Sequence, residues 1–106
     1  MSKLRFYRDD DNAPRAVGND EESSALAQLL ESDIQDDAVT CRELLERIRV
    51  NDQADAPLVH TGNSFMLTLT QKNATIGTLS LDNDKQFTLD SRTVELELNN
   101  WLNFIS

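Results

Sequence analysis

The chain is poor in the residues from which most catalytic and metal sites are built. Its 106 residues include one cysteine, one histidine and three glycines. A single cysteine cannot form an internal disulfide, and one imidazole cannot supply a cluster of histidine ligands. The three glycines do not form a phosphate-binding loop, and there is no paired-cysteine motif. We therefore predict a non-enzymatic protein without a metal ion or cofactor.

Basic residues are also scarce. Ten lysines and arginines face nineteen acidic residues, which gives a net charge of -9 and a pI near 4.4. This balance opposes binding to nucleic-acid phosphates and to anionic membranes, so neither is an expected partner. The first residues lack the apolar core of a signal peptide, which favours a cytoplasmic location.

The apolar content is sufficient for one core. Hydrophobic residues make up 39% of the chain and charged residues 27%, which is typical of a globular domain. A domain of this length buries roughly 65% of the surface that its unfolded chain exposes. We therefore expect a single α+β domain over residues 1–106 that folds without disulfides or metal.

The stretch 58–89 alternates apolar and polar residues, as half-buried strands do. Turn residues interrupt it at Gly62-Asn63, Lys72-Asn73 and Asn83-Asp84. If each pair forms a two-residue turn, the predicted partners are Leu58 with Leu67, His60 with Phe65, Leu69 with Ile76, Leu67 with Thr78, and Leu89 with Thr78. The stretch thus predicts an antiparallel meander of three to four strands.

This register gives the sheet two unequal faces. The inner face collects the large apolar side chains, around the smaller Thr78 and Ser80: Leu58, Phe65, Leu67, Leu69, Ile76, Phe87 and Leu89. Trp101 is expected in the core near that central dip. The outer face is mostly polar but pairs Met66 with Leu79 and places Leu81 nearby, and the N-terminal segment or a partner is expected to cover these residues.

The flanking segments supply the helices. A strand over Lys3–Arg8 and a weaker one over 13–17, restricted to an edge by Pro14, precede a helix capped by Asn19 or Asp20 that ends near Ser32. Thr40 and Glu43 form a capping-box pattern for a second helix, which ends near Val50 before a linker over 51–57. The expected fold is α+β, a β-meander packed on helices, in the order β(β)-α-α-β-β-β-β-α.

The C-terminal segment has two interpretations. As a helix from about Thr93, it places Val94, Leu98, Trp101, Leu102 and Ile105 on one stripe and leaves Leu96 on the opposite side. As a strand, Val94, Leu96 and Leu98 alternate with acidic residues. The helix explains more apolar positions and is preferred.

Three groups could carry chemistry. His60 is the side chain best suited to proton transfer near neutral pH, and it supports an alternative function as a small-molecule binder or enzyme. Cys41 begins the second helix but falls on its apolar stripe, which favours a buried thiol. Asp82, Asp84 and Asp90 lack the spacing of a calcium-binding loop, so solvated turns are the preferred interpretation.

The acidic residues of the first third give the leading functional hypothesis. Such residues accelerate association with a basic surface, which predicts an interaction protein of the inhibitor, immunity or DNA-mimic type that binds a basic protein partner. The candidate contacts are Asp9, Asp10, Asp11, Asp20, Glu21, Glu22, Asp36 and Asp37. A simple role in solubility is the competing explanation. A second alternative is a homodimer formed through apolar residues, with Met66, Leu79, Leu81 and Leu96 as the candidate contacts.

Overall fold

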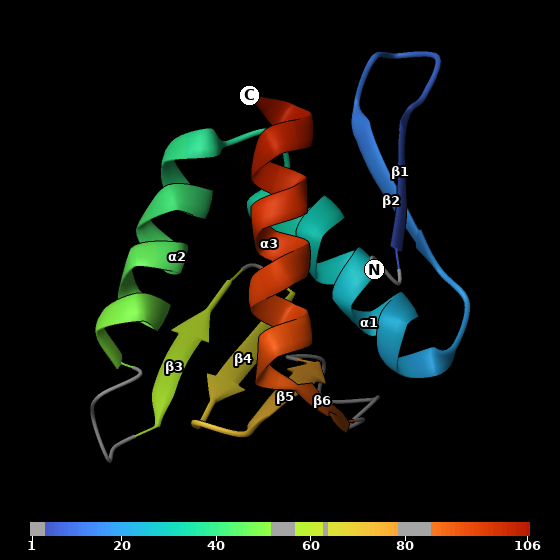
Figure 1. Cartoon of the computed structure of the whole chain (residues 1–106). Coiled ribbons are helices and arrows are strands. Elements are labelled where there is room, and N and C mark those ends of the chain that lie inside the picture. Colours follow the sequence, from blue (N-terminus) through green and yellow to red (C-terminus); the bar gives the residue numbers. More distant parts are fainter. Residues whose placement is uncertain (1–3, 52–56, 63, 79–85) are drawn as a thin grey trace.

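A four-stranded antiparallel sheet forms one layer of the molecule, and the helices cover only one of its faces (Figure 1). The computed structural model describes residues 4–51, 57–62, 64–78 and 86–106. The sheet consists of β3 (Leu58–Thr61), β4 (Phe65–Leu69), β5 (Asn73–Thr78) and β6 (Gln86–Asp90), in the order β3-β4-β5-β6. The fold is α+β with an antiparallel meander packed on helices, which confirms the predicted class and element order.

The predicted strand register is wrong, although the strands themselves are correct. Leu58 pairs with Leu69, and Leu67 pairs with Ile76. The second turn closes one residue early, because the Thr70 hydroxyl donates to the Asn73 carbonyl at 3.1 Å and the Thr70 N–H donates to the same oxygen at 2.8 Å. Gln71 and Lys72 are therefore the central turn residues.

The turn between β3 and β4 is held by a residue outside the sheet. The Asp33 carboxylate accepts from the backbone N–H groups of Ser64 at 2.9 Å and Phe65 at 3.0 Å. The proposed turn at Asn83-Asp84 lies outside the described residues, but Leu89 pairs with Ala74 rather than Thr78. Every shift spans an even number of residues, so each side chain stays on its predicted face.

The inner face forms the core as predicted. Leu67 and Ile76 are fully buried at its centre. Phe87 is half-buried at the margin, and the remaining predicted inner-face residues are buried, namely Leu58, Phe65, Leu69 and Leu89. Ala74 joins them opposite Leu89. Burial of most of this face explains why the sequence pattern could identify this side of the sheet.

A separate two-stranded hairpin precedes the helices. It pairs β1 (Leu4–Arg8) with β2 (Pro14–Gly18), and Pro14 is the first residue of β2, as its missing N–H requires. The hairpin stands beside α1 (Glu21–Leu29) and the C-terminal helix, on the helical side of the sheet (Figure 1). It therefore leaves the outer face of the four-stranded sheet uncovered.

Gly18 allows β2 to pass close to the first turn of α1. A Cβ atom at this position would lie 2.4 Å from the Ser23 carbonyl carbon and 2.6 Å from the Ser24 nitrogen. Gly18→Ala should therefore lower the free energy of unfolding by about 1 to 3 kcal/mol, because backbone must move to relieve the overlap. Chemical denaturation measures the loss. Gly77→Ala is the matched control, since its Cβ would meet nothing closer than 3.7 Å, and an equal loss in both variants would contradict the packing argument.

The first helix ends in a π-helical turn. Asp20 caps α1 by accepting from the Ser23 N–H at 2.7 Å. The α-helix becomes the π-helical segment η1 (Leu30–Ile34), and Gln35 ends it with a positive φ of 56°. The helix was expected to end near Ser32 because Asp33 interrupts its apolar stripe. The π-turn instead continues the helix and directs Asp33 toward the β3–β4 turn.

The second helix, α2 (Ala38–Asn51), begins before the predicted capping box. Asp37 is the cap, because its carboxylate accepts from the Thr40 N–H at 3.1 Å and the Thr40 hydroxyl at 2.7 Å. Thr40 therefore lies inside the first turn rather than at its start. Asp37 was predicted as a partner contact; it is exposed as well as being the cap of α2, and its contact with a partner stays a prediction.

The C-terminal segment is a helix, α3 (Ser91–Ile105), as preferred from its apolar stripe. Asp90 caps it through the Arg92 N–H. Trp101 is fully buried, but its ring packs edge-on against Phe6 at 5.1 Å between centroids, and its Nε1 donates to the Gln35 carbonyl at 2.8 Å. Thr78 instead lines a hollow bounded by α1 and other sheet residues, while Ser80 lies outside the described residues. Trp101 thus joins the hairpin, the π-turn and α3.

Candidate functional site

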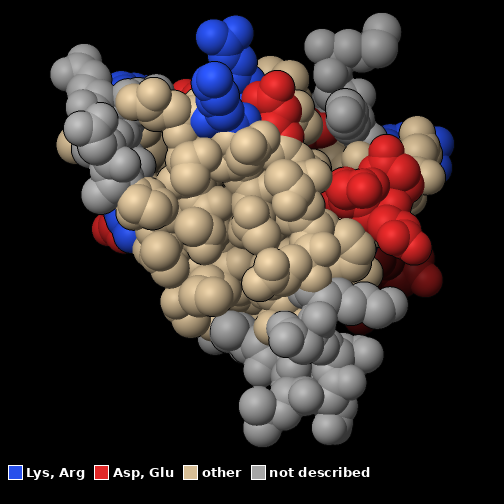
Figure 2. All heavy atoms as spheres, turned by 90° about the horizontal axis from the view of Figure 1, so that it is seen from below, with Lys and Arg blue, Asp and Glu red and all other residues tan. Residues whose placement is uncertain are grey.

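The outer face of the sheet is a broad uncharged surface. Figure 2 views the molecule from the sheet side and shows no acidic or basic residue across the middle of this face. Two rows of paired side chains cross the strands. The first row contains Val59, Thr68, Thr75 and Thr88, and the second contains Thr61, Met66, Gly77 and Gln86. We call these eight residues the outer sheet face.

Its composition is mixed rather than strongly apolar. Val59 is 47% exposed and Met66 37% exposed, while the threonines and Gln86 supply hydroxyl and amide groups. Threonine is β-branched, so its side chain has little rotational freedom to lose on binding. The surface is therefore stiff, and it combines apolar contact with hydrogen-bonding capacity.

The predicted self-association residues do not form one surface in the described structure. Met66 lies on the outer sheet face, whereas Leu96 is 41% exposed on α3. The helices lie on the opposite side of the sheet from the outer face (Figure 1). Leu79 and Leu81 lie outside the described residues. The dimer that these residues suggested therefore stays a prediction.

The eight acidic candidates are distributed over three places. Asp9, Asp10 and Asp11 form the end of the β1–β2 hairpin, Asp20, Glu21 and Glu22 begin α1, and Asp36 and Asp37 precede α2. In Figure 1 the hairpin end lies at the top, whereas α1 begins near the other end of the hairpin. The sequence cluster is therefore not a single surface in the fold.

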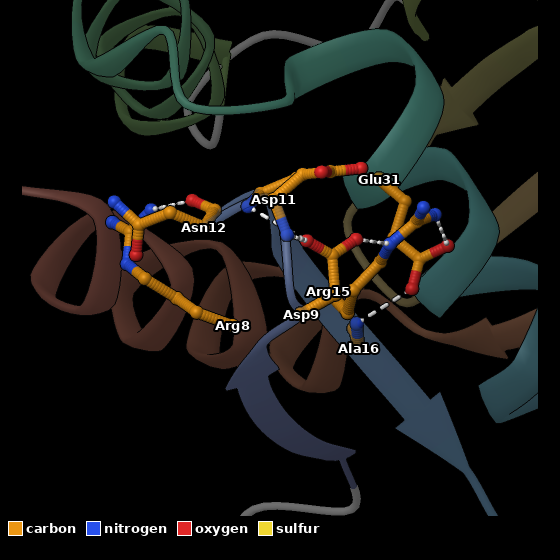
Figure 3. A network of polar contacts seen from close by, with 8 residues as sticks. Arg8, Asp9, Asp11, Asn12, Arg15, Ala16 and Glu31 are labelled. Carbon is orange, nitrogen blue, oxygen red and sulfur yellow. Dashed lines mark hydrogen bonds and ion pairs between the residues drawn. The ribbon is translucent and has the colours of Figure 1, made fainter.

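The Asp9 carboxylate is hydrogen-bonded to groups of its own hairpin (Figure 3). Its carboxylate accepts from the backbone N–H groups of Asp11 at 2.9 Å and Ala13 at 3.0 Å, and from Arg15 Nε at 2.8 Å. The hydrogen bond from Arg15, together with the two backbone hydrogen bonds, lowers the pKa of Asp9. Asp9 therefore shapes the turn, while Asp10 and Asp11 are exposed beside it.

Arg15 also connects the hairpin with η1. Its Nη1 lies 3.6 Å from Glu31 Oε2, and the other Glu31 oxygen accepts from the Ala16 N–H at 2.7 Å. Figure 3 shows Arg15 between Asp9 and Glu31. This arginine is thus held by two carboxylates of its own chain, and the pairing raises its pKa.

The acidic group at the start of α1 borders the outer sheet face. Asp20, Glu22 and Asp90 line one hollow of about 350 Å³ together with Thr88 of that face. Glu21 is exposed next to Glu22 in the first turn of the helix. Figure 2 shows a group of acidic side chains at the right margin of the uncharged surface, and other acidic side chains beside basic ones at its upper and left margins. We call Asp20, Glu21, Glu22 and Asp90 the acidic margin.

Helix capping accounts for only part of this acidic margin. Asp20 caps α1 and Asp90 caps α3, so the N-termini of both helices lie next to carboxylates of the acidic margin. Each N-terminus carries roughly half a positive elementary charge, which offsets about one of the four carboxylate charges. Among the described residues, neither Glu21 nor Glu22 has an ion-pair partner. The acidic margin therefore retains negative charge beyond what the helix ends require.

His60 lies beside an arginine, and the Asp33 carboxylate is close enough to act on it electrostatically. Its Nδ1 is 3.5 Å from Arg47 Nη1, and Arg47 Nη2 donates to the Val59 carbonyl at 2.9 Å. Partial burial, together with the Arg47 charge, lowers the pKa of His60. Among the described residues, no carboxylate is hydrogen-bonded to the imidazole to orient it as a catalytic base, so its surroundings favour a structural role.

Because the pKa of His60 is lower in the folded chain than in the unfolded chain, stability should depend on pH. The unfolded chain takes up a proton near pH 6.5, whereas the folded chain resists it. Stability should therefore be full near pH 7.5 and fall as the pH drops below about 6.5 toward the lower folded pKa. Urea unfolding at about pH 7.5 and about pH 5.5 tests this. His60→Gln should lose this pH dependence, and an unchanged slope in that variant would contradict the assignment.

Cys41 is buried on the apolar stripe, as predicted. Its exposed fraction is 0%, and its thiol donates to the Leu98 carbonyl at 3.4 Å. Burial raises its pKa to about 11, so the reactive thiolate is disfavoured at neutral pH. Cys41 therefore contributes packing between α2 and α3.

Within residues 4–51, 57–62, 64–78 and 86–106, no three His, Cys, Asp or Glu side chains are placed to hold a metal ion. Asp82 and Asp84 lie outside these ranges. None of the helices in the same ranges is both long and apolar enough to cross a membrane. Comparison with protein family models, curated proteins and solved structures gave no match.

Sequence reasoning missed the polar residues that connect distant elements. Arg47 reaches β3, Asp33 holds the β3–β4 turn, and Glu97 is fully buried beneath β1. Val59 and Thr61 were also absent from the predicted outer face. Their alternation with Leu58 and His60 was a usable signal, whereas nothing near Asp33 or Glu97 in the sequence identifies their partners.

Proposed function

We propose that this chain is a small, non-enzymatic interaction protein that binds a basic protein partner. The observation that carries the proposal is the acidic margin, where Glu21 and Glu22 are exposed without ion pairs in the described structure. The net charge of -9 adds a long-range field that attracts cations. The same field repels nucleic-acid phosphates, so direct nucleic-acid binding is not part of the proposal.

The surroundings of the titratable groups support binding over catalysis. The altered pKa values of Asp9, Asp37, Cys41 and His60 arise from a turn, a helix cap, burial and a neighbouring arginine. Each shift therefore has a cause in the fold, and none belongs to a convergent acid–base pair. An acidic surface needs no such pair, because it acts by accelerating encounter and rejecting partners of like charge.

Three double variants with equal charge changes test the proposal in a capture experiment from host lysate. Glu21→Gln/Glu22→Gln alters the acidic margin, Asp10→Asn/Asp11→Asn alters the hairpin end, and Glu43→Gln/Glu46→Gln is a control on α2. Each removes two carboxylates and raises the net charge from -9 to -7. The caps Asp20, Asp37 and Asp90 stay unchanged, and the control loses only the exposed Glu46–Arg49 ion pair, so we expect all three variants to fold; circular dichroism checks this.

We expect the wild-type and α2-control baits to retain a basic protein that the Glu21→Gln/Glu22→Gln bait loses. Retention should also weaken as salt rises, because salt screens exposed charges beyond about 8 Å at physiological ionic strength. If all four baits recover the same proteins in equal amounts, the acidic residues serve solubility and the proposal fails.

A further inference from the structure

We propose that the basic partner docks on the outer sheet face, with its lysines or arginines over the acidic margin. This inference rests on the proposed function and assigns it a surface. The face is uncovered by the helices and by the β1–β2 hairpin (Figure 1), and its middle is uncharged (Figure 2). Protein interfaces commonly combine an uncharged centre with a charged rim, and Thr88 belongs both to this face and to the hollow lined by Asp20 and Glu22.

Charge complementarity indicates which kind of molecule binds the outer sheet face. A basic partner places cations over the acidic margin while its uncharged surface meets the threonines. A second copy of this chain brings the same acidic margin and the same net charge of -9, so its approach is opposed electrostatically. The face is also less apolar than the interface of a permanent homodimer, since Val59 and Met66 are its two large apolar side chains. These observations favour a basic heterologous partner.

The edges of the sheet are less accessible to such a partner than its face. Strand addition at β3 would have to displace Arg47, whose guanidinium bonds the Val59 carbonyl at 2.9 Å. At the other edge, the start of α1 lies against β6, where Asp20 and Ser23 share a hollow with Leu89 and Asp90. Protected edges are a common feature of soluble sheets. The partner is therefore expected to lie across the strands.

Site-specific photo-crosslinking tests the surface directly. A photoreactive phenylalanine analogue replaces Thr75 at the centre of the face, Thr88 beside the acidic margin, or Val39 as an exposed control on α2. Each bait is irradiated in host lysate, and cross-linked peptides are identified by mass spectrometry. We expect Thr75 and Thr88 to link to the basic protein that the Glu21→Gln/Glu22→Gln bait loses, and Val39 to give no such link.

Two results would overturn the proposal. Cross-links from Thr75 to another molecule of the same chain would assign the face to self-association. Equal yields from Thr75 and Val39, or none from Thr75 and Thr88, would show that the partner does not lie on the face. If the Glu21→Gln/Glu22→Gln bait still loses its partner in the latter case, the proposed function survives without this surface.

The partner identified in this way then allows a quantitative measurement. Thr75→Arg introduces a bulky cation at the centre of the face and should weaken the Kd for the purified partner about tenfold or more, because like charges repel at the contact. Val39→Arg adds the same charge on α2 and should leave the Kd unchanged. Circular dichroism establishes that both variants are folded. Equal affinities for Thr75→Arg and the wild type would contradict the docking site.

Discussion

Replacing Trp101 with alanine should lower the free energy of unfolding by about 3 to 5 kcal/mol. The indole is fully buried, packs against Phe6 and Phe104, and donates to the Gln35 carbonyl. The substitution therefore removes apolar contacts, leaves a cavity and deprives a carbonyl of its donor. A loss of this size is a large part of the 5 to 15 kcal/mol typical of a domain. Thermal unfolding should show a midpoint lowered by roughly 15 °C or more.

Two further variants separate the causes of this effect. Leu96→Ala lies on the same helix but is 41% exposed, so its loss should stay within about 1 kcal/mol. Trp101→Phe keeps most of the ring packing but removes the hydrogen bond to Gln35, and an intermediate loss is expected. Equal stability of Trp101→Ala and Leu96→Ala would show that the indole does not connect the hairpin with the core.

Replacing Glu97 with alanine should cost about 2 to 3 kcal/mol, the second largest loss expected for a single residue. Glu97 is fully buried on α3, where one carboxylate oxygen accepts from the Leu4 N–H at 2.9 Å and the other from the Asn100 side-chain amide at 3.1 Å. The substitution removes a charged acceptor from a buried site and breaks the polar link between β1 and α3. Chemical denaturation measures the loss.

The location of the faster hydrogen exchange distinguishes a role of Glu97 in anchoring the hairpin from a general loss of stability. Amide hydrogen exchange in Glu97→Ala should accelerate first in β1 and β2, while β4 and β5 keep most of their protection. Glu97→Gln keeps the shape but turns one acceptor into a donor toward Leu4 or Asn100, so a smaller loss is expected. Uniform acceleration over all strands would contradict the assignment of Glu97 as the hairpin anchor.

The sheet illustrates what local patterns can predict. Phe65, Leu67 and Leu69 alternate with Met66 and Thr68, and the period of two is sufficient to assign their face. The pairing partners were wrong because the turns depend on groups that the pattern ignores, namely the Thr70 hydroxyl and the distant Asp33 carboxylate. The predicted face of each side chain was nevertheless correct, because the register differs from the predicted one by an even number of residues. A prediction of faces is therefore more robust than a prediction of partners.

The acidic candidates show the limit of composition. Their number and charge were evident from the sequence, but Asp9, Asp20 and Asp37 each accept backbone hydrogen bonds that hold a turn or a helix end. Short acidic side chains before a helix commonly serve as caps, which was a usable signal for Asp37. Proximity of Glu22 to Thr88 was not predictable, because the two residues belong to elements far apart in the chain.

The sequence by itself determined the α+β class, the order of elements, the buried face of the sheet and the excess of negative charge. These properties depend on local periodicity and composition, which the chain carries in any conformation. Only the tertiary structure decided which acidic residues border the outer sheet face, that the hairpin leaves this face open, and that Asp33, Arg47 and Glu97 act as internal connections. Those properties depend on how distant segments pack, because contacts between elements are set by three-dimensional geometry rather than by neighbours in the chain.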